Sequence, residues 1–156
     1  MSNEALTPNI LIVEGLFYQE LAAELRQGAI EAIERAQATH DVVSVPGAFE
    51  IPAAIRIGVE ASRSGQSSRV IHGFVALGCV IRGETTHYDY VCQQSAAGLM
   101  KLALEHNLAL GYGILTVENQ EQAWARARVG DGNKGGAAAE ACLAMIALKG
   151  RLGLLP

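Results

Sequence analysis

The chain has 156 residues with a formal net charge of −4, and half of its residues are hydrophobic. This length is typical of one domain with a sizeable core, and the modest charge argues against a disordered protein. The sequence contains no basic cluster of the kind that binds nucleic acid and no apolar run long enough to cross a bilayer. The start, MSNEALTPN, lacks the basic and apolar segments of a signal peptide, so we expect a cytoplasmic protein.

The cysteines and histidines do not form a metal-binding pattern. Cys79, Cys92 and Cys142 are odd in number and far apart, so neither a CxxC pair nor a disulfide framework is predicted. The histidines at positions 40, 72, 87 and 106 lack the spacing of metal ligands. We therefore expect buried thiols in a reducing compartment and no metal.

Short apolar runs and helical patterns alternate through the first half of the chain. Residues 1–8 are polar and contain a proline, which predicts a flexible arm on a single domain covering residues 1–156. Purely apolar runs are typical of strands buried on both faces, whereas apolar residues three and four apart indicate a helix. By these criteria the predicted order is strand 10–13, helix 19–38, strand 41–45 and helix 51–63, followed by a surface loop at 64–68.

The second half continues the alternation. The predicted order is strand 70–80, helix 88–105, strand 108–117, short helix 120–128, flexible turn 130–136 and helix 137–149. Gly111 and Gly113 inside the fourth strand indicate a close approach by a group that the sequence does not identify. The inner side of helix 88–105 is expected to carry Val91, Ala96, Leu99, Leu102 and Ala103.

Strand and helix alternate four times, which predicts an α/β fold with a four-stranded parallel sheet between two layers of helices. In such a three-layer α/β/α sandwich, ligands bind beyond the carboxyl ends of the strands. Those ends are predicted at residues 15–18, 46–50, 79–87 and 116–119. At three of the four, an aromatic or ionisable residue stands next to glycine or proline, and we expect the binding chemistry there.

The stretch GCVIRGETTHYDYV, residues 78–91, combines a strand end, a turn and a helix start. The turn Gly83-Glu84-Thr85 offers backbone N–H groups and a hydroxyl to a small anion such as phosphate. Taken alone, such a turn is more typical of an ordinary capped helix, and Glu84 adds an unfavourable charge. His87, which follows directly, can carry a proton near neutral pH and is a candidate general acid or base. A lone histidine is more often structural, but this one lies at a predicted ligand-binding edge.

Other candidates have simpler explanations that the sequence leaves open. Arg126 and Lys134 bracket the GDGN turn and suit an anionic ligand, although the sequence alone favours solvated surface cations. Arg128 is a competing candidate at nearly the same place. Phe17 and Phe49 at two strand ends can stack on a flat heterocycle or simply pack in the core. Glu50 can accept hydrogen bonds from a polyhydroxyl chain or sit at a helix start for electrostatic reasons.

Four segments together resemble one family, lumazine synthase, which makes 6,7-dimethyl-8-ribityllumazine in the penultimate step of riboflavin biosynthesis. They are VPGAFEIP at 45–52, LGCVIRGETTHYDYV at 77–91, GILTVEN at 113–119 and GNKGG at 132–136. The resemblance implies a flavodoxin-like fold. It also implies condensation of 5-amino-6-(ribitylamino)uracil with 3,4-dihydroxy-2-butanone 4-phosphate, without a metal or organic cofactor. In that family the site lies between subunits of a pentameric ring, so we expect a homo-oligomer, either a pentamer or a multiple of pentamers.

The resemblance also implies roles for individual residues. Phe17 is expected to stack on the pyrimidine ring, and His87 is expected to be the principal proton carrier. The ribityl chain is assigned to Ala48, Phe49 and Glu50, the ring pocket to Val80 and Ile81, and a contact from the adjacent subunit to Tyr112. The phosphate is assigned to Gly83, Glu84, Thr85 and Arg126, and the pyrimidine end to Lys134.

Three positions depart from the family pattern. Leu16 replaces an arginine of many members, Tyr18 replaces a common asparagine, and Ala137 replaces an acidic residue that some members place near the catalytic histidine. The alternative to an enzyme is a paralogue that binds a flavin or lumazine without turnover. A receiver domain is disfavoured because Glu14 is the only acidic residue at the end of the first strand.

Overall fold

A computed structural model describes residues 5–155 and shows a four-stranded, all-parallel sheet with the strand order β2-β1-β3-β4. The strands are β1 (Asn9–Gly15), β2 (Thr39–Val45), β3 (Gly73–Ile81) and β4 (Leu110–Val117). The helices are α1 (Gln19–Arg35), α2 (Ile51–Arg63), α3 (His87–His106), α4 (Gln120–Ala127) and α5 (Lys134–Arg151), with a 3₁₀ turn, η1, at Ala48–Glu50.

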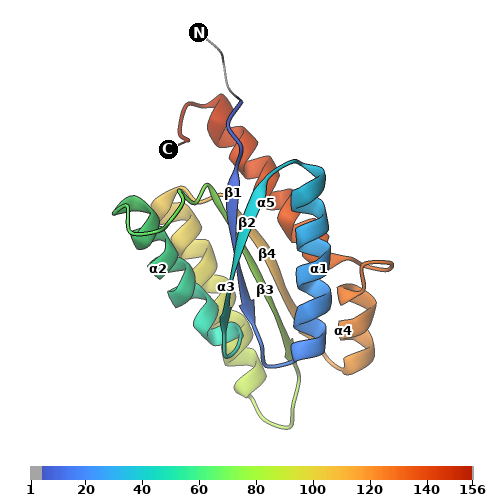
Figure 1. The fold of residues 1–156 in the computed structure, drawn as a ribbon. Coiled ribbons are helices and arrows are strands. Elements are labelled where there is room, and N and C mark those ends of the chain that lie inside the picture. The colour runs from blue at the N-terminus through green and yellow to red at the C-terminus, as the bar shows by residue number, and fades with distance from the viewer. Residues whose placement is uncertain (1–4, 156) are drawn as a thin grey trace.

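The sheet separates two helical layers (Figure 1). Helices α1, α4 and α5 cover one face, and α2 and α3 cover the other. Successive residues of the central strand β1 point to opposite faces of the sheet, so the strand contributes to both hydrophobic cores. Ile10 and Ile12 pack under α1, while Leu11 and Val13 pack under α2. The predicted three-layer α/β/α sandwich is therefore confirmed, and its strand order is the flavodoxin-like one.

Glycines allow α5 to pack closely on its neighbours. A Cβ added at Gly135 would overlap the carbonyl oxygen of Leu25 in α1, and one added at Gly111 would overlap the carbonyl oxygen of Ala138. The close approach that Gly111 and Gly113 predict is thus made by α5 itself, not by a ligand. In the GNKGG segment, Gly132 likewise lies against the backbone of Ala125 in α4, whereas Gly136 leaves room for the side chain of Asn133.

Several predicted boundaries were wrong. Residues 134–136 were expected in a flexible turn, but they form the first turn of α5, because Asn133 adopts a left-handed conformation and its side chain accepts a hydrogen bond from the N–H of Gly136 at 3.2 Å. Helix α1 ends at Arg35 rather than residue 38, just before Gln37 at φ 57°. Strand β3 begins at Gly73, three residues later than expected.

Helix α3 is less buried than its sequence indicated. Of the residues expected on its inner side, only Leu99 is fully buried, whereas Tyr90, Met100 and Leu104 are among the exposed large hydrophobic side chains. The predicted arm falls partly on residues 1–4, which lie outside the described residues. Within residues 5–155, no helix is long and apolar enough to cross a membrane.

Candidate active site

The loops after β1 and β2 are held together at the carboxyl edge of the sheet. The N–H of Leu16 donates to the carbonyl oxygen of Val45 at 3.0 Å. A Cβ added at Gly15 would lie 2.9 Å from the backbone of Gly47, so these two backbone segments approach each other as closely as glycine allows. This contact sets the segment that carries Phe17 beside the segment that carries Phe49.

A pocket of about 450 Å³ opens between these loops and the end of β3. We call it the active-site pocket. Nine of the predicted site residues line it, and they come from three separate segments of the chain: Phe17, Ala48, Phe49, Glu50, Val80, Ile81, Gly83, Thr85 and His87. The pocket lies at the carboxyl ends of the neighbouring strands β1 and β3. From β1 the chain continues to β2 on one side, and from β3 it continues to β4 on the other side. Flavodoxin-like sheets bind ligands at such a switch point.

The walls of the active-site pocket are mainly apolar and aromatic. Phe17 and Phe49 are 74% and 60% exposed, although phenylalanine is usually a core residue. Phe17 contacts Tyr18 edge to face, with ring centroids 4.9 Å apart. Two exposed aromatic rings at the mouth of an apolar pocket suit a flat heterocyclic ligand.

The turn between β3 and α3 forms the polar end of the pocket. Thr85 caps the helix, because its hydroxyl oxygen accepts a hydrogen bond from the N–H of His87 at 3.3 Å, whereas Thr86 makes no side-chain cap. The N–H of Asp89 is also occupied, by the carbonyl oxygen of Thr86. The hydroxyl hydrogen of Thr85 remains able to donate to an anion.

Arg82 fixes this turn from outside the pocket. Its guanidinium pairs with Glu118 at 2.7 Å and with Asp89 at 3.5 Å, and it lies 4.2 Å from the centre of the Tyr88 ring. These contacts tie the start of α3 to the end of β4. They act on the loop that presents Thr85 and His87, so we regard Arg82 as a positioning residue.

Several lining groups keep their protons at neutral pH. Burial raises the pKa of the Cys79 thiol to about 12, with Cys92 adding to the effect. Burial also raises the pKa values of the Tyr18 and Tyr88 hydroxyls. The pocket is also lined by the imidazole of His87 and the carboxylate of Glu50, which are side chains of the kinds that act as general acids and bases. The His87 ring makes no hydrogen bond within residues 5–155, so it is free to meet a ligand.

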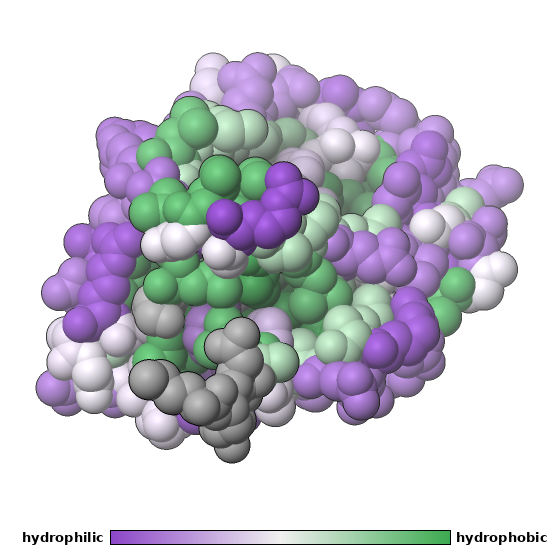
Figure 2. Space-filling model, turned by 90° about the horizontal axis from the view of Figure 1, so that it is seen from above, coloured by the Kyte–Doolittle hydropathy of each residue, from purple (hydrophilic) through white to green (hydrophobic). Residues whose placement is uncertain are grey.

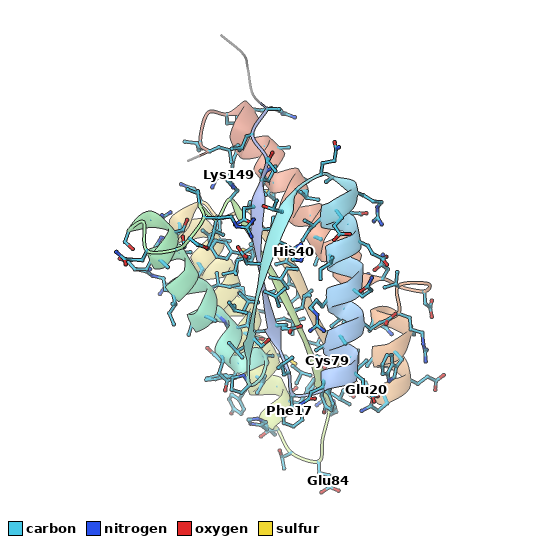
Figure 3. All side chains as sticks on the ribbon, viewed as in Figure 1. Phe17, Glu20, His40, Cys79, Glu84 and Lys149 are labelled. Carbon is cyan, nitrogen blue, oxygen red and sulfur yellow. The ribbon has the colours of Figure 1, made fainter. Side chains whose placement is uncertain are left out.

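Four predicted site residues lie away from the active-site pocket. Glu84 is at the exposed tip of the β3–α3 turn, where it extends away from the sheet (Figure 3). Tyr112 is half exposed on the edge strand β4. Arg126 and Lys134 are exposed on α4 and α5, in the helical layer on the other side of the sheet from α3. One chain alone therefore does not bring Arg126 or Lys134 to His87.

Sequence reasoning missed some lining residues. Tyr18, Tyr88, Val91 and Cys79 line the pocket but were not named as site residues. Tyr88 and Val91 directly follow His87 on the first turn of α3, so the helical period could have revealed Val91 as one turn from His87. Cys79 directly precedes Val80 and Ile81 near the end of β3, where residues on both faces of the strand become partly exposed.

Glu14, the acidic residue at the end of β1, is structural. It is 2% exposed, and its carboxylate accepts two hydrogen bonds from Arg26, at 2.6 and 2.7 Å, and a third from the Ser44 hydroxyl at 2.9 Å. A buried carboxylate needs such partners. Among the described residues no group of three His, Cys, Asp or Glu side chains is arranged to hold a metal ion.

Comparison with known proteins gives a consistent result. The sequence profile of the 6,7-dimethyl-8-ribityllumazine synthase family matches residues 7–150. A protein of that name from Azorhizobium caulinodans is 57% identical over 91% of this chain and 86% of its own length. 6,7-dimethyl-8-ribityllumazine synthase 1 of Rhizobium meliloti is 57% identical over 93% and 94%, and the Agrobacterium fabrum synthase is 53% identical over 94% and 97%. Fold, pocket and similarity together show that the chain belongs to the 6,7-dimethyl-8-ribityllumazine synthase family.

Proposed function

We propose that this chain condenses 5-amino-6-(D-ribitylamino)uracil with 3,4-dihydroxy-2-butanone 4-phosphate to give 6,7-dimethyl-8-ribityllumazine, phosphate and water. The observation that carries the proposal is the active-site pocket, which brings two exposed aromatic rings together with His87 and the Thr85 hydroxyl. The two substrates need these two kinds of group. A flat heterocycle can stack on aromatic rings, and a phosphate ester can accept hydrogen bonds from a hydroxyl and from backbone N–H groups.

The pyrimidine substrate fits the apolar part of the pocket. Phe17 offers a ring face for stacking, and Val80 and Ile81 add apolar surface to the lining of the same pocket. The carboxylate of Glu50, with the backbone of Ala48 and Phe49, stands beside them and can accept hydrogen bonds from the ribityl hydroxyls. Tyr18, which replaces asparagine here, contributes an edge to the Phe17 ring and restricts its orientation.

The phosphate of the second substrate fits the turn at the start of α3. Gly83 and Thr85 line the pocket there, and the Thr85 hydroxyl can donate to a phosphate oxygen. The positive end of a helix also favours an anion at this position. Glu84 extends away from the sheet, so its charge is held at a distance from the anion.

The reaction needs protons moved but no nucleophile from the protein. The 5-amino group attacks the ketone carbon, and loss of water gives an imine. A proton then leaves the carbon next to the imine, and the C–O bond to phosphate breaks by elimination, which leaves an enol. Protonation of the terminal carbon of the enol and loss of its hydroxyl proton give a methyl ketone. The ribitylamino nitrogen finally attacks this new carbonyl carbon, and a second water is lost as the ring closes. His87 at the mouth can take and return these protons, a role worth roughly 10²–10⁴-fold in rate.

The site is completed by a second copy of the chain in this proposal. Tyr112, Arg126 and Lys134 lie outside the pocket of their own subunit, as described above, and a neighbouring subunit can supply them. Tyr90, Met100 and Leu104 are exposed at helical spacing along one face of α3, which suits burial against another copy. We propose a homo-oligomer built from pentamers, with each subunit a single cytoplasmic domain.

Two further departures from the family pattern are tolerated by this arrangement. Leu16 is half-buried next to Phe17, and its apolar side chain adds no charge there. Ala137 is exposed on α5, in the helical layer that reaches a site only across a subunit boundary.

The test is to mix the two substrates with the protein and follow the absorbance of the lumazine. The proposal expects product in proportion to enzyme and release of one phosphate for each lumazine. Binding of lumazine or riboflavin without formation of product would contradict the proposal and favour a non-catalytic paralogue.

A further inference from the structure

A second pocket, of about 580 Å³, lies at the end of the molecule opposite the active-site pocket. We call it the amino-end pocket, because it forms where the chain enters β3 and β4 and where α2, α3 and α5 end. Figure 3 shows Lys149 at this end, far from Phe17 and Glu84. Seen from this end, hydrophobic residues gather near the centre and hydrophilic ones surround them (Figure 2). The volume lies within the range of small-molecule sites.

The charges that line the amino-end pocket are all of one sign. Arg63 and Lys149 are cationic, His72 and His106 are basic, and none of the described lining residues is Asp or Glu. Burial and the nearby Arg63 lower the pKa of Lys149, and burial and Lys149 contribute to a lowered pKa of His72. Within residues 5–155, the positive potential of these groups is not neutralised by a carboxylate in the pocket lining.

Hydrogen-bond donors remain available in this pocket. Arg63 uses two of its five N–H groups, on the ring nitrogen Nδ1 of His106 at 2.8 Å and on the His106 carbonyl oxygen at 2.9 Å. The Nδ1 atom of His72 accepts a hydrogen bond from the N–H of Asn9 at 3.0 Å, so its Nε2 atom carries the hydrogen of the neutral ring. Lys149 donates no hydrogen bond within residues 5–155.

A purely structural explanation accounts for only part of this arrangement. Cations often lie at helix C-termini because they interact well with the carbonyl groups there, and Arg63 does so at the end of α3. Lys149 stands in the last turn of α5, half-buried, without a bond to a described carbonyl group or carboxylate. Burying part of a lysine beside an arginine is unfavourable unless an anion relieves the repulsion.

The remaining wall of the amino-end pocket is apolar. Val59 and Phe74 form its inner side, and Leu154 and Leu155 form its outer side. An inorganic anion would leave this surface exposed to water. A carboxylate attached to an apolar body would use both parts, since its two oxygens match two separate donors and its body covers the apolar wall.

We propose that the amino-end pocket binds a small organic carboxylate, with the carboxylate between Lys149 and Arg63 and its apolar body against Phe74 and Leu155. This site is separate from the active-site pocket and does not depend on the proposed reaction. Its ligand is defined by a single negative charge on an apolar chain or ring.

Octanoate is a suitable probe, with 1-octanol as an uncharged analogue of the same length. Titration calorimetry on the full, assembled protein is expected to show one octanoate per chain and binding of octanol at least about tenfold weaker. Lys149→Met keeps the length of the side chain but removes the charge, and it should weaken octanoate binding by about tenfold to a hundredfold. Lys101→Met, on the exposed face of α3, is the matched control and should have no effect.

A crystal grown with octanoate gives an independent measurement. The carboxylate is expected within hydrogen-bond distance of the Lys149 ammonium and the Arg63 guanidinium. If Lys149→Met folds poorly, Arg63→Met tests the same charge from the other helix. Equal binding of octanoate and octanol, unchanged affinity in the Lys149→Met protein, or octanoate seen only in the active-site pocket would each overturn the proposal.

Discussion

The substitution His87→Ala removes the imidazole from the mouth of the active-site pocket and leaves the loop that carries it intact. The His87 side chain is exposed, and the one hydrogen bond that holds the residue uses its backbone N–H, donated to Thr85. Alanine keeps that N–H, so the free energy of unfolding should change by less than about 0.5 kcal/mol. The rate should change far more, because proton transfer by a positioned side chain contributes roughly 10²–10⁴-fold.

We therefore expect kcat to fall by about 10²–10⁴-fold, which corresponds to about 3–5 kcal/mol in the activation free energy. Lumazine absorbance measures the rate, and thermal unfolding and particle mass in solution check fold and assembly. His40→Ala is the matched control, since His40 lies near the start of β2, at the other end of the sheet. Turnover within about threefold of the unmodified protein would refute the reasoning and place the proton carrier elsewhere.

Three further predictions concern single residues. Arg126→Ala should weaken binding of the phosphate substrate by about 1.5–3 kcal/mol and leave the pyrimidine unchanged, whereas Arg128→Ala should affect neither; equal weakening of both substrates would contradict the assignment. Gly135→Ala should destabilise the protein by about 1–3 kcal/mol in denaturant unfolding, because its methyl group meets the Leu25 carbonyl, while Gly130→Ala has open space. The Cys79 thiol, with a pKa of about 12, should react with iodoacetamide at pH 8 about a thousandfold more slowly than a free cysteine, and the rate should increase as the pH rises. Peptide mass spectrometry measures the labelling, and labelling of Cys79 as fast as that of a free cysteine would contradict the prediction.

Local patterns in the sequence predicted most of the fold. Helix α2 was predicted at its observed bounds, because its amphipathic period stops at a polar loop. Apolar runs at β1 and β3 indicated buried strands, and the alternation of strands and helices then requires a parallel sheet. The start of α5 was missed because Lys134, Gly135 and Gly136 resemble a loop by composition. Their helix is stabilised by close packing on α1, which no local pattern reveals.

The site was predictable in part for the same reason. His87, Thr85 and Phe17 stand at strand ends, and parallel strands bring their ends to one edge, so these residues were expected together. Tyr18 and Cys79 resemble core residues in the sequence, and only the folded chain shows that they border a pocket. The positions of Arg126 and Lys134 depend on α4 and α5 covering the far face of the sheet, which the order of elements alone does not determine.

The central claim is that His87 of one subunit works with Arg126 of another. Chains carrying His87→Ala and chains carrying Arg126→Ala can be unfolded, mixed in equal amounts and refolded together. In a ring with one interface per site, about one site in four then combines an intact His87 with an intact Arg126. With the phosphate substrate held well below its KM, we predict that the mixture regains about a quarter of the activity of the unmodified protein, while each variant refolded alone stays at least about tenfold less active than the unmodified protein. A mixture no more active than the two variants measured separately would contradict the shared site.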